Sequence, residues 1–142
     1  MQILRKTAAA VLSLLLLSAP PAASAADLNP AEMAAMADFI AARTEGEPYA
    51  VRLALSAVLL NRLEDPRYPD TVSGILAAEG YRAVRRSREY PSARAALRAA
   101  MEGLDITDGA TAWALRGTPS GVMPRLVIGE WTFGEEGPRP TG

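Results

Sequence analysis

Histidine and cysteine are both absent from this chain of 142 residues. Without histidine there is neither a Ser-His-Asp triad nor a Cys-His pair, and without cysteine there is no disulfide framework. Zinc sites draw most of their ligands from these two residue types, so the sequence predicts no metal site. Glycine-rich phosphate loops are missing too, because Gly46, Gly74 and Gly80 are isolated. The enzyme chemistry left open uses aspartate or glutamate as general acid or base.

An excess of positive charge is also lacking, since the formal net charge is −1 at pH 7. The sequence therefore gives no electrostatic argument for a nucleic-acid partner. One segment is locally basic, because it has four arginines between residues 82 and 88. This pattern predicts either a solvated loop or a contact with an anionic wall polymer. Protein partners cannot be inferred from this composition.

The first 25 residues have the pattern of a signal peptide. Arg5 and Lys6 precede an apolar run over residues 8–19, and Ala23-Ser24-Ala25 fits the small-residue cleavage rule. About a dozen apolar residues are short for a bilayer span, although an uncleaved anchor is the alternative. We expect export, a domain over residues 26–134, a disordered tail over residues 135–142, and a secreted or cell-wall location.

Helical patterns fill most of the expected domain. A capping pattern at Asn29 to Glu32 begins the first helix. Pro48 is expected to open a second helix that is apolar on nearly all sides and lies at the centre of the core. The remaining elements are expected as helices over residues 72–78 and from Pro91 to Gly103, and as strands over residues 110–115 and 126–133. The fold class predicted is α+β, with a helical core and a short antiparallel sheet near the C-terminus.

Two carboxylates lie on the short Gly/Pro segment between the first two helices, at Glu45 and Glu47. Glu47 directly precedes Pro48, where a carboxylate can cap the following helix and interact with its dipole. This cap lowers a carboxyl pKa, whereas a general acid needs a raised one. Glu45 is therefore the better candidate acid, and Glu47 is expected mainly to stabilise the helix start, although both are candidate catalytic residues.

Several segments, in order along the chain, resemble the spore-cortex-lytic cell wall hydrolases with a SleB/CwlJ-type catalytic domain. They are Glu-Gly-Glu-Pro-Tyr at 45–49, Ala-Leu-Ser-Ala-Val at 54–58, Leu-Asn-Arg at 60–62, Tyr-Pro-Asp-Thr-Val-Ser-Gly-Ile at 68–75, Gly-Tyr-Arg-Ala-Val at 80–84, the Ala, Gly, Asp and Thr positions from 99 to 110, and Ile-Gly-Glu-Trp-Thr-Phe at 128–133.

This resemblance implies a small lysozyme-like domain that cleaves the glycan strands of peptidoglycan, as a hydrolase or lytic transglycosylase, with no cofactor. It also implies a glutamate two residues before Glu45, and this chain has Arg43 there; a histidine of the last strand is Trp131. A second hypothesis is therefore a degenerate member that binds peptidoglycan without cleaving it, and a third is a secreted scaffold unrelated to glycan. Candidate substrate-binding residues are Tyr49, Asn61, Tyr81 and Trp113, although a structural hydrogen bond in the core is the favoured role for Asn61 and core packing the favoured role for each aromatic alone.

Overall fold

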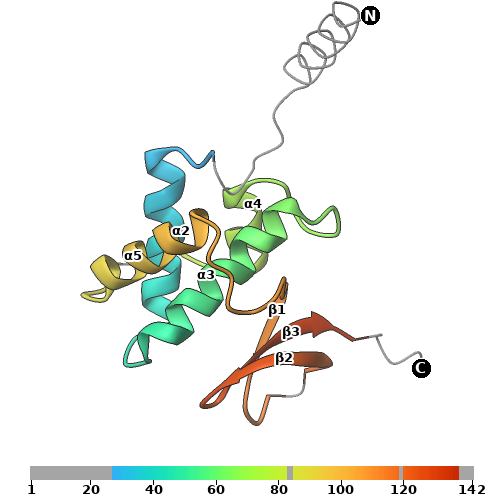
Figure 1. Ribbon diagram of the computed structural model, residues 1–142. Coiled ribbons are helices and arrows are strands. Elements are labelled where there is room, and N and C mark those ends of the chain that lie inside the picture. The colour runs from blue at the N-terminus through green and yellow to red at the C-terminus, as the bar shows by residue number, and fades with distance from the viewer. Residues whose placement is uncertain (1–26, 83–84, 119, 138–142) are drawn as a thin grey trace, which may run out of the picture.

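The computed structural model describes residues 27–82, 85–118 and 120–137. Four helices come first and three strands follow. They are α2 (Pro30–Arg43), α3 (Tyr49–Glu64), α4 (Val72–Ala78), α5 (Tyr90–Met101), β1 (Ala112–Leu115), β2 (Val122–Ile128) and β3 (Trp131–Glu136). The helices form one body and the sheet lies beside it, next to α3 (Figure 1). The predicted α+β class is confirmed.

Helix α2 begins with the capping box expected from the sequence. The side chain of Asn29 accepts a hydrogen bond from the Glu32 backbone, and the Glu32 carboxylate accepts one from the Asn29 backbone. Two backbone donors that the first turn would leave unpaired are thereby satisfied. Thr71 caps α4 with a single hydrogen bond, which its hydroxyl accepts from the Gly74 amide, so two helix starts follow from local sequence alone.

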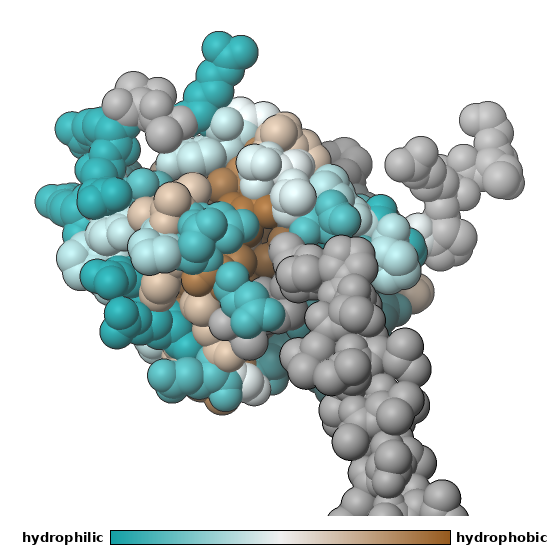
Figure 2. Space-filling view, turned by 90° about the horizontal axis from the view of Figure 1, so that it is seen from above, coloured by the Kyte–Doolittle hydropathy of each residue, from teal (hydrophilic) through white to brown (hydrophobic). Residues whose placement is uncertain are grey.

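Helix α3 is the centre of the core, as its apolar pattern predicts. Every residue from Val51 to Leu60 is buried, and Leu55, Val58 and Leu59 have no exposed surface. Helix α5 packs against it on one side and the sheet on another. Since burial of a large aliphatic side chain contributes about 1.5–3 kcal/mol, this helix dominates the stability of the fold. Figure 2 shows hydrophobic residues at the centre of one face, within a rim of hydrophilic ones.

The sheet is antiparallel, with the strand order β1-β3-β2. The expectation of a single strand over residues 126–133 is wrong: Ile128 pairs with Trp131, so this segment is a hairpin with Gly129 and Glu130 as its loop. Gly129 has φ +57°, a conformation that glycine adopts readily in two-residue hairpin loops. Strand β2 also begins at Val122, before the strand expected from residue 126, and β3 continues to Glu136, into the expected tail.

The predicted signal peptide and the end of the predicted tail fall outside the part of the chain that the structure describes. Residues 1–26 and 138–142 lie outside the described residues. Within the described ranges, no helix combines the length and the apolar character needed to cross a membrane.

Candidate active site

The link between α2 and α3 is a tight turn, and we call residues 44–48 the 44–48 turn. The Thr44 carbonyl accepts hydrogen bonds from the Glu47 amide at 3.0 Å and from the buried Arg52 guanidinium at 3.1 Å. Gly46 has φ +77°, which the third position of a type II turn requires. The backbone at Glu45 is therefore non-helical and firmly held. In a regular helix, residue 45 would lie on the face opposite residue 43. Because the backbone at Glu45 is not helical, its carboxylate is not carried to that opposite face.

The two glutamates of this turn have different surroundings. Glu45 is exposed and lines a cleft of about 530 Å³ together with Arg85, Arg86 and Arg88. Glu47 is half-buried, and no side chain caps the start of α3. The expected cap from Glu47 is therefore wrong. Pro48, with extended backbone, takes the capping position itself, and Glu47 lies one residue too early to reach the free amides.

Tyr81 and Trp113 come together on Phe39 of α2, and we call these three residues the aromatic cluster. The Phe39 ring meets Tyr81 edge to face at 5.2 Å between centroids and Trp113 at 6.4 Å. Phe39 is fully buried, whereas Tyr81 and Trp113 are half-buried. Burial, and secondarily the negative charge of Asp38, raise the pKa of the Tyr81 hydroxyl. Both candidate sugar-stacking residues are thus fixed by packing on one side.

Arg43, where the family pattern has its glutamate, lies at the edge of the aromatic cluster. Its guanidinium carbon is 5.2 Å from the centroid of the Phe39 ring, and it donates a hydrogen bond of 3.0 Å to the Glu79 carbonyl. Phe39 and Arg43 are four residues apart on α2, a spacing that places both on one face of the helix. A cation therefore stands where the resemblance implied an acid.

Arg62 joins α3 to the sheet and to the end of α4. Its guanidinium lies between the rings of Tyr68 and Trp113, 4.8 and 4.5 Å from their centroids. It pairs with the Glu79 carboxylate at 2.6 Å and donates to the Thr111 carbonyl at 2.7 Å. Phe39, Tyr68 and Glu79 were not expected in this region from the sequence. Only the spacing of Phe39 and Arg43 could have indicated one of them.

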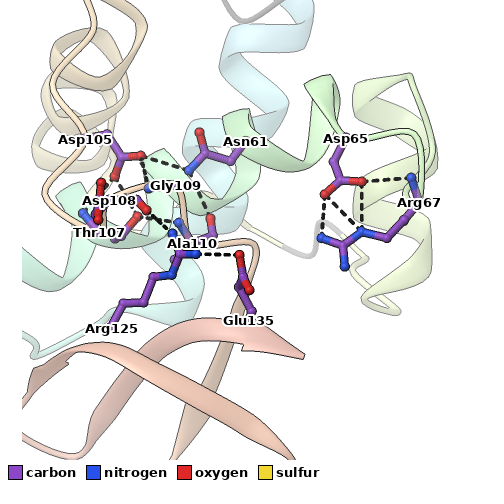
Figure 3. Close-up of polar contacts among 10 residues, drawn as sticks. All are labelled: Asn61, Asp65, Arg67, Asp105, Thr107, Asp108, Gly109, Ala110, Arg125 and Glu135. Carbon is purple, nitrogen blue, oxygen red and sulfur yellow. Dashed lines mark hydrogen bonds and ion pairs between the residues drawn. The ribbon is translucent and has the colours of Figure 1, made fainter. Parts of the chain in front are cut away.

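Asn61 has a structural role. Its amide nitrogen donates both hydrogen bonds available to it, at 3.0 Å each, to the Asp105 carboxylate and to the Ala110 carbonyl (Figure 3). Asp105 also accepts hydrogen bonds from the Thr107 amide and hydroxyl and from the Gly109 amide. Asn61 therefore fixes the turn that leads into β1, and its amide N–H groups are not available to a substrate.

The Asp105 turn predicts a pH-dependent stability. Burial raises the pKa of the Asp105 carboxyl. The hydrogen bonds from Thr107, Asn61 and Gly109 lower this pKa by more than burial raises it, so the net shift is downward. A lowered folded-state pKa contributes stability above the unfolded value of about 3.9, and that contribution is lost as pH falls through the folded pKa. We expect Asp105→Asn to lower the free energy of unfolding by about 1–3 kcal/mol at pH 7.

Chemical denaturation between pH 2 and pH 7 measures this effect. The difference between wild type and Asp105→Asn should shrink below pH 4. Asp70→Asn is the matched control, because Asp70 is exposed. A difference that stays constant with pH would show that the Asp105 charge does not stabilise the turn.

The six candidate residues do not form one constellation. Glu45, Glu47 and Tyr49 share the turn and the start of α3, where Tyr49 is 45% exposed. The aromatic cluster holds Tyr81 and Trp113, and Asn61 belongs to a separate network. Across residues 27–82, 85–118 and 120–137, no group of three or more acidic, histidine or cysteine side chains is placed to hold a metal ion.

Proteins of similar sequence indicate the family to which this chain belongs. A spore cortex-lytic enzyme of Halalkalibacterium halodurans is 38% identical over 81 residues, which cover 54% of this chain and 24% of that protein. A spore cortex-lytic enzyme of Bacillus cereus is 34% identical over 80 residues, covering 53% of this chain and 31% of that protein. The chain thus spans less than a third of these relatives' length.

Two solved structures are similar over most of their length. The catalytic domain of the Bacillus cereus SleB protein superposes with a TM-score of 0.64 at 25% identity, covering 75% of this chain and 91% of that one. The catalytic domain of the germination-specific lytic transglycosylase SleB of Bacillus anthracis gives 0.60 at 25% identity, covering 75% and 95%. A family model described as Cell Wall Hydrolase matches residues 46–129, more than half of the chain. This chain belongs to the cell wall hydrolase family.

Proposed function

We propose that this protein cleaves the glycan strands of peptidoglycan, as a hydrolase or a lytic transglycosylase. The observation that carries the proposal is the similarity to SleB catalytic domains, which extends over 91% and 95% of those chains. One of these domains is described as a lytic transglycosylase. The match to the family described as Cell Wall Hydrolase, over residues 46–129, includes helices α3 to α5 and strands β1 and β2.

Glu45 supplies the acid in this proposal. A protonated carboxyl donates its proton to the oxygen of the scissile glycosidic bond, and that bond breaks with the electron pair leaving on the oxygen. The resulting carboxylate then takes a proton from the attacking hydroxyl, either of water or of the same sugar, and is protonated again. Glu45 can reach a bound glycan because it is exposed, and its position is fixed because the buried Arg52 holds the 44–48 turn.

Aromatic side chains supply binding surface for the sugar rings. Tyr49 is exposed at the first residue of α3, four positions after Glu45. Tyr81 and Trp113 are half-buried, so part of each ring remains available for stacking. No metal or organic cofactor takes part in the proposed reaction.

A second candidate function is peptidoglycan binding without cleavage, and one observation favours it. Arg43 replaces the glutamate of the family pattern, and its side chain is engaged by the Phe39 ring and the Glu79 carbonyl. A groove with this cation and no competent acid would hold glycan without breaking it. The protein would then act as a wall-binding or regulatory module.

Sedimentation combined with product release separates the two functions. Purified protein is incubated with insoluble peptidoglycan, and pelleted protein and soluble sugar are both measured. We expect wild type to release soluble fragments. If wild type pellets with the wall and releases nothing, while Arg43→Glu releases fragments, the binding module is the correct function.

Action on peptidoglycan places the protein outside the cytoplasmic membrane, and residues 1–25 are proposed to direct it there as a cleaved signal peptide. N-terminal sequencing of the native protein should give a start at or near Ala26. An intact Met1 on protein from the cytoplasmic fraction would contradict export.

A further inference from the structure

The loop before α5 presents arginines in a fixed arrangement. The Glu89 carboxylate at its end pairs with the buried Arg52 at 3.0 Å. Ser87 is buried, its hydroxyl accepts a hydrogen bond from the Glu89 amide, and its carbonyl accepts one from the Tyr90 amide. Residues 85–89 are therefore anchored to α3, and Arg52 ties the same loop to the 44–48 turn through the Thr44 carbonyl.

The arginines of this loop differ in how their charge is balanced. Arg86 pairs with Asp38 at 3.0 Å and lies over the Tyr90 ring, 4.0 Å from its centroid. Arg85 and Arg88 are exposed, and among the residues that the structure describes no carboxylate lies within ion-pair distance of either. Arg86 thus has a structural partner, whereas Arg85 and Arg88 have unbalanced charge.

These charges face one cleft that also contains Glu45. Its volume of about 530 Å³ lies within the range of small-ligand sites, about 300–1,000 Å³. With Arg86 balanced by Asp38, the lining carries two unpaired guanidinium groups against one carboxylate. The planar guanidinium matches a carboxylate in two-point hydrogen bonding, so the cleft suits an anionic group bearing carboxylates.

We propose that Arg85 and Arg88 bind the carboxylates of the peptide stems that a peptidoglycan strand carries, so that stem-bearing glycan is the preferred substrate. This inference rests on the proposed function, because the stems reach the cleft only if the glycan lies along the 44–48 turn. A stem held there also reduces the positive potential beside Glu45. The chemical class recognised is therefore a carboxylate-bearing peptide next to a sugar, rather than a bare glycan.

Binding to three wall preparations tests this site. Because removing the stems also breaks the cross-links that keep peptidoglycan insoluble, the probes are soluble, uncross-linked glycan strands. They are strands with intact stems, the same strands after an amidase has removed the stems, and intact strands freed of phosphodiester polymers. The variant Arg85→Gln/Arg88→Gln is compared with Arg94→Gln/Arg98→Gln, which removes two exposed arginines from α5. Arg86 stays unchanged because it pairs with Asp38.

We expect stem removal to raise the dissociation constant of the wild-type protein, measured by titration with the soluble strands, about 5- to 10-fold, an effect that added salt diminishes. The Arg85→Gln/Arg88→Gln variant should bind intact material that much more weakly and should not respond to stem removal, while the α5 variant should match wild type. Equal binding of wild type to intact and stem-free material would overturn the inference. So would a loss that follows the phosphodiester polymer instead of the stems.

Strand length is measured in the same samples, so failure of the proposed function can be distinguished from failure of the stem site. Protein that binds by way of the stems but does not shorten the strands contradicts glycan cleavage and leaves the stem site standing. Shortening that is equally fast for stem-bearing and stem-free strands contradicts the stem site and supports cleavage.

Discussion

Replacing Glu45 by glutamine is expected to lower the rate of fragment release from peptidoglycan at least about 100-fold, the usual share of general acid–base catalysis. The amide keeps the size of the carboxyl group but has no acidic proton to give to the leaving oxygen. Glu45 is exposed, and its backbone conformation is fixed by Thr44 and Gly46, so the substitution should leave the fold unchanged. Rates measured at equal protein concentration, with thermal unfolding of both proteins, test this.

Glu47→Gln is the matched control for that experiment. It makes the same chemical change two residues away, in the same turn, at a half-buried carboxylate that caps no helix. We expect its rate to stay within a few-fold of wild type. If Glu47→Gln loses the activity and Glu45→Gln keeps it, the assignment of the acid is reversed. If both variants keep full activity, neither carboxylate takes part in the reaction.

The largest effect on stability is expected at Arg62, for which alanine should lower the free energy of unfolding by about 3–5 kcal/mol. The side chain is only 9% exposed, and its removal leaves the Glu79 carboxylate and the Thr111 carbonyl without their partner. It also takes away the cation that lies between the Tyr68 and Trp113 rings. Urea denaturation followed by tryptophan fluorescence measures the loss.

A double-mutant cycle with Glu79→Gln separates the ion pair from the packing of Arg62. Removing the carboxylate after Arg62→Ala should cost far less than removing it from wild type, since the carboxylate no longer has a cation to neutralise. Arg67→Ala, which breaks the exposed pair with Asp65 at the start of the next loop, should have little effect. An Arg62→Ala loss below about 1 kcal/mol would show that the contact does not hold the sheet to α3.

The helices could be predicted because their signals are local. Asn29 and Glu32 define the start of α2 within four residues, and the all-round apolar pattern of α3 specifies burial without any partner being known. The hairpin was missed because Gly129 and Glu130 interrupt an otherwise strand-like run, and the strand pattern alone does not place a two-residue loop. Tertiary pairing of Ile128 with Trp131 determines the turn.

The candidate site was predicted less completely, because its contacts join distant segments. Arg62 meets residues that are 17 and 49 positions away, at Glu79 and Thr111, and no spacing rule connects them. The cap expected from Glu47 failed since the helix starts one residue later than its sequence suggested. The resemblance to the family nevertheless drew attention, from sequence alone, to the segment between α2 and α3 and to Arg43 at the position of the family glutamate.

Mass spectrometry of the soluble products from purified protein and intact peptidoglycan shows whether the protein cuts glycan strands. We expect fragments cut within the glycan strand, ending in an anhydro sugar if the protein is a transglycosylase or in a reducing sugar if it is a hydrolase. Release of peptides from uncut glycan, or no release by wild-type protein that pellets with the wall, would contradict glycan-strand cleavage.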